Sequence, residues 1–358
     1  MKSVSVIIPA YKPDEKMLST LTELANAGFS DILVVDDGSG EEYSEIFRKA
    51  AAIPECTILR HPVNRGKGAA LKTAMTFFLD NRPEQAGVVT ADADGQHLTD
   101  DIIATSRAML EKNCVVLGCR DFSLPHVPST SRAGNRITIA VFRLFFGMRV
   151  SDTQTGLRAF PRHTLPIIMT AKGDRYEFET YMLFLINQHR LPFDEVKIST
   201  VYIEENKSSH FRKVRDSIRI YALLLKYLLS SVAASIIDEG AFFLFKLLFG
   251  GVATILFIPT TFVAAFLARI ISSIVNYLIN AKVVFEGQTS KKTLIKYYVL
   301  ALGQIAVSTC VVFLAERLFG IESAFLTTLI KIITDTILFF FSFRIQHKWV
   351  FKKTPAKH

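Results

Sequence analysis

The sequence has only four cysteines and one tryptophan among 358 residues, and just 21% of its residues are charged. The cysteines, Cys56, Cys114, Cys119 and Cys310, show neither metal-ligand spacing nor a disulfide framework, which favours a reducing compartment. No signal peptide is expected, because the first apolar run, 4–9, is strand-length and leads directly into a polar turn. The 50% hydrophobic content excludes a disordered or fibrous chain.

Hydrophobic residues are spread unevenly along the chain. Residues 1–216 have the composition of a soluble α/β domain, whereas residues 217–358 form long apolar segments separated by short basic loops. We therefore expect two domains, and the second excludes a wholly soluble protein.

Strand and helix patterns alternate through the first half. Short β-branched runs predict strands at 3–9, 31–36, 56–59, 87–90 and 114–118. Helical periodicity separates them at 15–27, 41–51, 66–79 and 99–111. This alternation predicts a mostly parallel sheet with helices on both faces.

Polar side chains follow each predicted strand, at the edge where such sheets bind ligands. They are Tyr11, Asp36, Asp37, Asn64, Asp92, Asp94 and Arg120. Their convergence predicts a functional site at the carboxyl ends of the strands.

Four segments of the second half are long enough to cross a membrane, at 222–249, 259–284, 297–315 and 324–343. Fourteen Lys and Arg residues lie in the loops and tail on one side, and only Arg317 lies on the other. The positive-inside rule then predicts an integral protein of the cytoplasmic membrane, with the first domain and both termini cytosolic.

The segment 133–148 is apolar but too short to span a membrane, and it is accompanied by Arg132, Arg136 and Arg143. We favour a helix in the membrane interface, where arginines meet anionic headgroups. A helix packed in the core is the alternative.

The pattern Asp92-Ala-Asp94-Gly-Gln96 offers hard oxygen ligands for Mg²⁺ or Mn²⁺, which complete their coordination with phosphate oxygens and water. On a neighbouring strand, Asp36 and Asp37 add a second acidic position. The run Asn64-Arg-Gly-Lys-Gly begins a predicted helix whose amides and Lys67 suit a diphosphate. It lacks the P-loop order, which disfavours an ATPase.

In this order, the motifs I-P-A-Y, V-V-D-D-G-S, N-R-G-K-G-A-A and A-D-A-D-G-Q-H resemble family 2 glycosyltransferases of the GT-A fold. S-R-A-G-N, D-T-Q-T-G-L-R, R-Y-E-F-E and E-E-N-K-S-S-H-F-R narrow the resemblance to the polyprenyl-phosphate branch, which includes dolichol-phosphate mannose synthase. The second half resembles GtrA-like four-helix membrane domains, through N-Y-L-I-N-A-K-V-V-F and R-I-Q-H-K-W-V-F.

The resemblance implies roles for individual residues. Nucleotide contacts would come from Pro9, Tyr11, Asp36, Asp37, Lys67, Asp92 and Arg212. Asp92, Asp94 and Gln96 would hold the metal, Arg120 and Arg132 the acceptor phosphate, and Asp152, Gln154 and Glu179 the sugar. The residues expected to act in catalysis are Asp94, Arg120, Arg132, Asp152 and Gln154. Lys12-Pro13 departs from the family's usual N-E after the tyrosine, which leaves the nucleotide's identity open.

These features predict an inverting hexosyltransferase that moves a sugar, with UDP-glucose favoured, onto a polyprenyl phosphate. UDP-N-acetylglucosamine, UDP-galactose or GDP-mannose as donor, a diacylglycerol or ceramide acceptor, and a processive polysaccharide synthase stay as alternatives. The synthases typically carry Q-x-x-R-W before their membrane helices, whereas the single tryptophan here, Trp349, follows the last span. The expected partners are nucleotide sugar, lipid phosphate and bilayer, with no nucleic acid, and a homo-oligomer stays open.

Charged residues inside the predicted spans suggest that the second domain could also move the glycolipid across the membrane. They are Asp238, Glu239, Arg269, Lys331 and Asp335. Lys331 and Asp335 stand four residues apart, so a structural pair on one helix is the alternative.

Overall fold

The computed structural model describes residues 1–125, 127–201, 213–249, 252, 254–255, 258–285, 287, 289–320 and 324–351. The chain divides into two compact units, Met1–Ile220 and Tyr221–His358. We call them the α/β unit and the helical unit, and each is described by itself.

The α/β unit is built on one seven-stranded sheet of order β3-β2-β1-β4-β6-β5-β7. Its strands are β1 (Val4–Ala10), β2 (Ile32–Asp36), β3 (Cys56–Arg60), β4 (Gly87–Thr90), β5 (Val115–Arg120), β6 (Arg158–Pro161) and β7 (Phe193–Ile198). β6 runs antiparallel to both of its neighbours, and the remaining pairs are parallel. The predicted mostly parallel sheet is confirmed, and β6 and β7 are additions to it.

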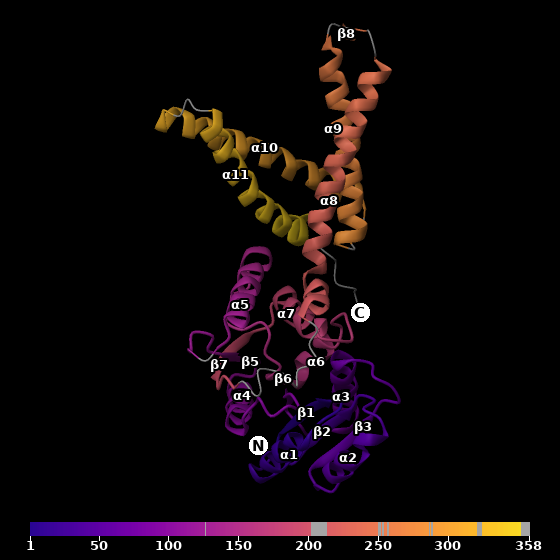
Figure 1. The fold of residues 1–358 in the computed structure, drawn as a ribbon, viewed down its shortest axis with the longest axis vertical. Coiled ribbons are helices and arrows are strands. Elements are labelled where there is room, and N and C mark those ends of the chain that lie inside the picture. Colours follow the sequence, from indigo (N-terminus) through magenta and orange to yellow (C-terminus); the bar gives the residue numbers. More distant parts are fainter. Residues whose placement is uncertain are drawn as a thin grey trace. The chain divides into compact units, whose positions relative to one another are not determined.

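Helices cover this sheet (Figure 1). They are α1 (Glu15–Asn26), α2 (Ser44–Ala51), α3 (Lys67–Asn81), α4 (Thr99–Lys112), α5 (Ser129–Val141), α6 (Leu165–Ile168) and α7 (Glu177–His189). Val6 and Ile8 of β1 pack with Leu21 of α1 and Ile102 of α4 in one core cluster. α3 packs against β1 and β2, and most of its first five residues are small, which permits close approach.

Strand register brings the polar strand ends to one edge. Ala10 at the end of β1 lies opposite Asp36 at the end of β2, and Asp36 lies opposite Arg60 at the end of β3. On the other side of β1, β4 runs parallel and ends at Thr90, opposite Ile7. The residues that follow these strands therefore begin close together.

The segment predicted to lie in the membrane interface forms α5 and a π-helical turn, Phe142–Phe146. One side of it is buried through Asn135 and Thr138. Its exposed side carries Ile137, which is 58% exposed, together with Arg136 and Arg143. An apolar residue between exposed arginines suits a lipid headgroup layer, so the interfacial role stays a prediction.

The helical unit consists of two helical hairpins, which diverge from each other (Figure 1). The first is formed by α8 (Lys213–Leu248) and α9 (Thr260–Ile279), with the short strands β8 (Thr254–Ile255) and β9 (Ile258–Pro259) in the connection. The second is formed by α10 (Lys291–Phe319) and α11 (Ala324–Ile345). Helices therefore occupy all four of the predicted spans.

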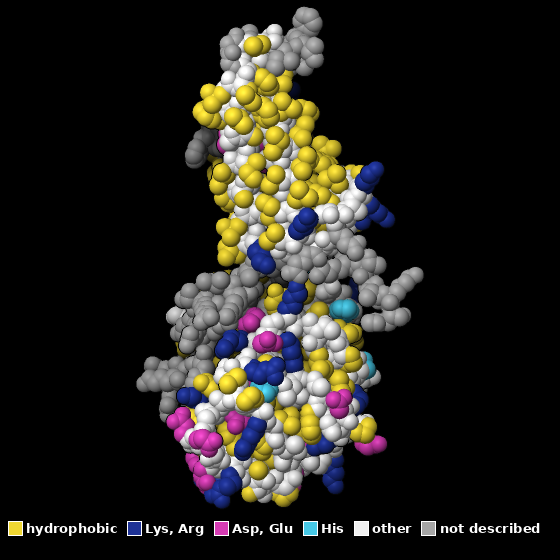
Figure 2. All heavy atoms as spheres, turned by 90° about the vertical axis from the view of Figure 1, so that its right-hand side faces the viewer, with side chains coloured by type: hydrophobic (Ala, Val, Ile, Leu, Met, Phe, Trp, Pro, Cys, Tyr) yellow, Lys and Arg dark blue, Asp and Glu magenta, His cyan; other side chains and the backbone are white. Residues whose placement is uncertain are grey.

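Within the described residues, two segments are long and apolar enough to cross a membrane, Leu225–Leu248 and Phe266–Val284. The outer surface of the helical unit is rich in hydrophobic side chains, while charged side chains gather on the α/β unit (Figure 2). Ile236 is 68% exposed and Leu318 is 72% exposed. Such a surface is suited to lipid and not to water.

Candidate active site

Lys67 lies at the centre of an ion cluster at the sheet edge. Its Nζ is 2.6 Å from Oδ1 of Asp92 and 2.9 Å from Oε1 of Glu179. α3 supplies the lysine, the loop after β4 supplies Asp92, and α7 supplies Glu179. Burial would lower the pKa of Lys67, but the two carboxylates outweigh burial and raise it, so the ammonium stays charged.

The two aspartates of the Asp92-Ala-Asp94 pattern have opposite pKa shifts. Burial would raise the pKa of Asp92, but Lys67, and then His97, lower it to about 2. Burial raises the pKa of Asp94 to about 6, with the charge of Asp92 as the next cause. The site therefore holds one firmly ionised carboxylate beside one that takes up a proton when the pH falls through about 6, and a cation bound to the pair would oppose that protonation.

The two carboxylates fit a divalent metal ion that is shared with a substrate. Within the described residues, no group of three or more His, Cys, Asp or Glu side chains is arranged to hold a metal. Mg²⁺ commonly uses one or two carboxylates and completes its coordination with phosphate oxygens and water. The ammonium of Lys67 against Asp92 shows that this position accepts a cation. Gln96 donates its backbone N–H to Asp94 Oδ1 at 3.1 Å, which keeps it next to the pair.

Arg120, at the end of β5, is fixed by a buried carboxylate. Its Nε donates to Oδ2 of Asp152 at 2.7 Å and its Nη2 donates to Oδ1 at 3.2 Å. Asp152 is fully buried, whereas the Arg120 side chain is 22% exposed. Arg120 also helps to lower the pKa of Asp92. A guanidinium held in this way presents a fixed positive charge to the site.

Arg132, in α5, holds the loop that follows β5. Its Nε donates to the carbonyl of Phe122 at 2.9 Å, and its Nη2 donates to that of Leu124 at 3.1 Å. Arg120 lies over the ring of the same Phe122, 5.0 Å from the ring centre. The structure thus brings the two predicted phosphate-binding arginines to one loop, where Arg132 binds backbone carbonyls, and its contact with the acceptor phosphate stays a prediction.

One short segment, 152–158, links the charged groups of the site. Asp152 binds Arg120 at one end, and Arg158 at the other end donates to the carbonyl of Glu179 at 2.6 Å. Between them, a Cβ on Gly156 would lie 2.7 Å from Oδ2 of Asp92. Gly156 is therefore the residue that lets this segment approach the acidic pair.

The motif D-T-Q-T-G-L-R at 152–158 supports the family resemblance, but no role was predicted for its Gly156 or Arg158. Arg158 is fully buried and binds backbone carbonyls of Thr153, Thr155 and Glu179. Burial lowers its pKa, and Glu179 is the first of the charges that oppose this. An arginine two residues after a glycine is a weak signal in one sequence, because its partners are backbone carbonyls, which any residue can supply.

Backbone amides just before α3 bind the carboxylate of Asp37. Asp37 accepts backbone N–H groups from Arg65 at 2.9 Å and Gly66 at 2.7 Å, and it also contacts His61 Nδ1 at 2.7 Å. Two amides of the run expected to bind a diphosphate, those of Arg65 and Gly66, therefore bind the chain's own Asp37, and the diphosphate contact stays a prediction. Lys67 is the part of the motif that reaches the ion cluster.

The remaining predicted residues lie around this cluster. Pro9, Tyr11 and Asp36 are partly buried at the ends of β1 and β2, and Asp36 accepts the backbone N–H of Ser39 at 2.9 Å. Gln154 is exposed, in contrast to its buried neighbours. Arg212 lies outside the described residues. The substrate contacts of all of these residues stay predictions.

The chain matches two family profiles, one in each half. Residues 5–166 match Glycosyl transferase family 2, and residues 226–351 match the GtrA/DPMS transmembrane domain. The fold and the site define a glycosyltransferase of the GT-A type joined to a helical membrane domain. The chain belongs to glycosyl transferase family 2, and it is an integral membrane enzyme.

Several known proteins are similar to more than half of this chain. An uncharacterized protein of Methanocaldococcus jannaschii is 35% identical over 210 residues, which are 57% of this chain and 84% of that protein. The UDP-N-acetylglucosamine–dolichyl-phosphate N-acetylglucosaminyltransferase of Methanococcus voltae is 28% identical, over 57% of this chain and 87% of its own length. The dolichyl-phosphate beta-glucosyltransferase of Dictyostelium discoideum is 25% identical, over 61% of this chain and 73% of its own length.

Among solved structures, glucosyl-3-phosphoglycerate synthase from Mycobacterium tuberculosis, in complex with Mn²⁺, UDP and glucosyl-3-phosphoglycerate, matches with a TM-score of 0.44 and 18% identity. The match covers 64% of this chain and 79% of that chain.

Proposed function

We propose that this enzyme transfers a hexose from a UDP-sugar to a polyprenyl phosphate, with inversion, at the cytosolic face of the cytoplasmic membrane. The observation that carries the proposal is the pairing of two oppositely charged groups of side chains at one sheet edge. Asp92 and Asp94 suit a metal on the donor diphosphate, and Arg120, fixed by Asp152, suits a second phosphate.

The acceptor is inferred from its chemistry and from the relatives. A phosphate monoester has a second pKa near 6, so it is already largely anionic in the cytosol and needs no strong general base. The main difficulty is to bring two anions together, which Arg120 eases by presenting its fixed charge. Relatives named for dolichyl phosphate and undecaprenyl phosphate, together with the GtrA/DPMS membrane domain, support a lipid phosphate.

The metal would be held by Asp92 and Asp94, next to Gln96. When bound, it would act as a Lewis acid that stabilises the leaving diphosphate. Lys67 then carries a second positive charge into the same region, and Glu179 keeps its ammonium in place. Gln154, which is exposed two residues after Asp152, would contact the sugar.

UDP-glucose is the favoured donor, and UDP-N-acetylglucosamine is the second candidate. Several relatives are dolichyl-phosphate beta-glucosyltransferases, and the Methanococcus voltae relative uses the N-acetylated sugar. Direct attack by the lipid phosphate on an α-linked donor would give a β-linked product. This agrees with the stereochemistry in the names of the glucosyl relatives.

The test is a transfer assay with the full chain in nanodiscs. Radiolabelled UDP-glucose, UDP-N-acetylglucosamine and GDP-mannose are each supplied with undecaprenyl or dolichyl phosphate and Mg²⁺ or Mn²⁺. With a UDP-sugar as donor, we expect radiolabelled lipid that is extracted into organic solvent and loses its label in mild acid. NMR of this product should show a β linkage between the sugar and the lipid phosphate. Label in an aqueous polymer, or in diacylglycerol, would contradict the proposal.

A further inference from the structure

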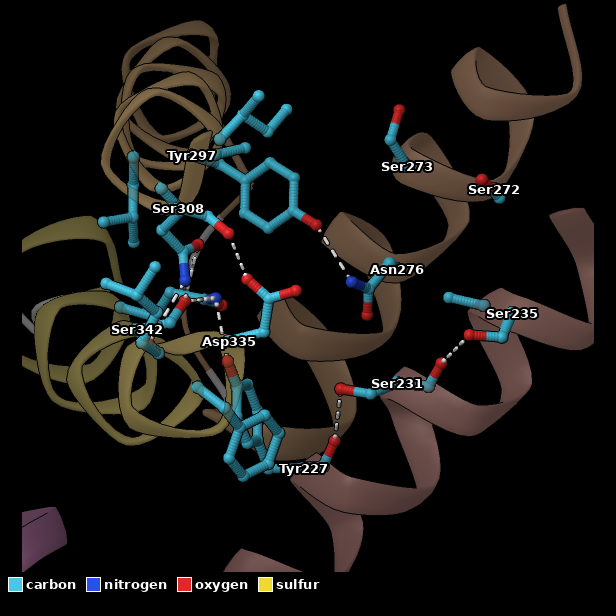
Figure 3. A pocket seen from close by; sticks show the side chains of 18 of the residues that line it. Tyr227, Ser231, Ser235, Ser272, Ser273, Asn276, Tyr297, Ser308, Asp335 and Ser342 are labelled. Carbon is cyan, nitrogen blue, oxygen red and sulfur yellow. Dashed lines mark hydrogen bonds between the residues drawn. The ribbon is translucent and has the colours of Figure 1, made fainter. Parts of the chain in front are cut away.

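The helical unit contains a cleft of about 550 Å³, lined by apolar and polar side chains of α8, α9, α10 and α11 (Figure 3). This volume is within the range of roughly 300–1,000 Å³ of small-molecule sites. Among the residues that line the cleft are Tyr227, Ser231, Ser235, Asn276, Gln304 and Asp335. An ionisable residue inside a membrane domain, such as Asp335, is a candidate for a functional role.

The hydrogen bonds of the serines leave the wall of the cleft rich in acceptors. Ser231 and Ser235 each donate the hydroxyl proton to the carbonyl four residues earlier in α8, at 3.2 Å. Ser272 donates either to Asp238 at 2.8 Å or to its own helix. A serine hydroxyl has one proton but two lone pairs, so these oxygens can still accept hydrogen bonds.

The amide side chains use both of their polar atoms: Oε1 of Gln304 accepts from Ser342 at 3.2 Å, and Oδ1 of Asn276 accepts from Asn280 at 3.3 Å. Gln304 donates through Nε2 to the carbonyl of Leu338 at 3.2 Å, and Asn276 donates through Nδ2 to the hydroxyl of Tyr297 at 3.0 Å. Ser308 donates to the carboxylate of Asp335. An amide nitrogen carries two N–H groups and a serine oxygen two lone pairs, so this wall can both donate and accept hydrogen bonds, as the hydroxyls of a sugar do.

The charges of the cleft disfavour an anion. Among the described lining residues the single cation is Arg269, and its Nη2 lies 2.9 Å from the carboxylate of Asp238. A phosphate would therefore meet, among the described lining residues, no cation other than one already paired with a carboxylate, whereas a sugar brings neutral hydroxyls that match the serine and amide groups.

We propose that this cleft binds the neutral, hydroxyl-rich head group of the glycosylated lipid, namely the sugar and not the phosphate. The inference rests on the proposed function, because it takes the lipid-linked sugar as its ligand. Tyr227 and Ser235 are eight residues apart on α8, which is about 12 Å at 1.5 Å per residue. The site would thus extend over more than a third of a hydrocarbon core of about 30 Å and hold a sugar below the headgroup layer.

The single tryptophan provides a probe inside this unit. Trp349 lies in the π-helical turn Gln346–Val350, and Gln346 of the same turn lines the cleft. The full chain in phosphatidylcholine nanodiscs is titrated, without nucleotide and with EDTA, using a short-chain prenyl-phosphate β-glucoside. A parallel titration uses the same prenyl phosphate without the sugar. Tryptophan emission is read in both.

Two variants change the cleft, and a third serves as a control outside it. Ser231→Leu combined with Ser235→Leu fills the cleft, and Gln304→Met removes one amide with little change of volume. Thr336→Leu is the matched control, because Thr336 also donates to the carbonyl four residues earlier but does not line the cleft. Gel filtration and circular dichroism check the folding of each variant.

We expect the wild type and Thr336→Leu to bind the glucoside at least tenfold more tightly than the bare phosphate. The preference should be lost in the serine double variant and reduced in Gln304→Met. Equal affinity for both lipids in the wild type would overturn the inference, as would an unchanged preference in folded variants of both kinds. The transfer assay separates the two proposals: transfer without the sugar preference refutes only the cleft site, and the preference without transfer refutes only the catalytic proposal.

Discussion

In the α/β unit, charged side chains of opposite sign meet where strands end, whereas in the helical unit hydroxyl and amide groups bond to one another across helices. Lys67 contacts both Asp92 and Glu179, and Arg120 contacts Asp152. By contrast, Asn280 of the helical unit accepts from Ser230 at 2.7 Å and donates to Gln346 at 3.2 Å. Each unit therefore uses the type of polar group that its surroundings tolerate.

This difference in polar groups indicates which kind of ligand each unit can bind. Water at the edge of the sheet lowers the free-energy cost of holding several charges, so that site can neutralise phosphates. Inside a bilayer, an unpaired charge is expensive, and neutral hydrogen bonds are the cheaper way to build a specific site. The comparison assigns phosphate chemistry to the α/β unit and lipid contact to the helical unit.

The largest effect is expected from Asp94→Ala. Removing one of the two carboxylates that suit the metal should lower kcat by about three orders of magnitude, which corresponds to about 4 kcal/mol. Asp94 is outside the core, so the melting temperature of the α/β unit should stay unchanged. Asp100→Ala, which changes an exposed acid at the start of α4, should keep wild-type transfer rates. Near-normal, metal-dependent turnover in Asp94→Ala would refute the metal assignment.

Arg120→Lys should act mainly on the acceptor. Lysine keeps the charge but loses the two-point contact with Asp152, so the KM for lipid phosphate should rise about 10- to 100-fold. The KM for the nucleotide sugar should change much less. Arg132→Lys is the comparison, because Arg132 holds backbone carbonyls, and it should affect both substrates mildly. Equal losses for both substrates in Arg120→Lys would show that this arginine does not face the acceptor.

Gly156→Ala should impair catalysis more than stability. The new Cβ would lie 2.7 Å from Asp92 Oδ2 and displace that carboxylate, so kcat should fall about tenfold or more. Gly134→Ala is the control: nothing lies within 4 Å of its added Cβ, and alanine favours the helix. A wild-type kcat in Gly156→Ala would mean that Asp92 does not need its present position.

The smallest effect on transfer is expected from the ion pair of the helical unit. Arg269→Leu leaves Asp238 without the guanidinium that lies 2.9 Å away, which should lower the melting temperature in nanodiscs by several degrees. Adding Asp238→Asn should restore part of that loss. Transfer to a short, water-soluble prenyl phosphate should change less than twofold in both variants. A large loss of that transfer would mean that the helical unit takes part in the chemistry.

Local pattern was sufficient to predict the first five strands, the helices between them and the convergence of polar strand ends. The alternation of short apolar runs and helical periods is a local signal, and parallel pairing then places the ends together. β6 was not predicted, because its four residues, Arg158–Pro161, are placed by pairing with β4 and β5 and not by their own composition.

The finer structure of the site depends on contacts that are distant in the sequence. The hydrogen bonds from the amides of Arg65 and Gly66 to Asp37 join residues nearly thirty positions apart. The same holds for Arg158 and Glu179, which meet through a carbonyl that any residue could supply. Lys67 could be identified as a site residue from its motif, but its partner Glu179 follows only from the packing of α3 against α7, and its partner Asp92 only from the position of the loop after β4.

The central claim is that the α/β unit performs the transfer and the helical unit presents the long lipid. The most direct measurement compares residues 1–220 alone with the full chain, using a short soluble prenyl phosphate and a long-chain acceptor in bilayers. The account predicts nucleotide binding and slow transfer to the short acceptor by residues 1–220. On the long acceptor their rate should fall by orders of magnitude, because the effective concentration of acceptor at the site is lost. Full activity of residues 1–220 on the long-chain acceptor, or failure to bind nucleotide at all, would contradict it.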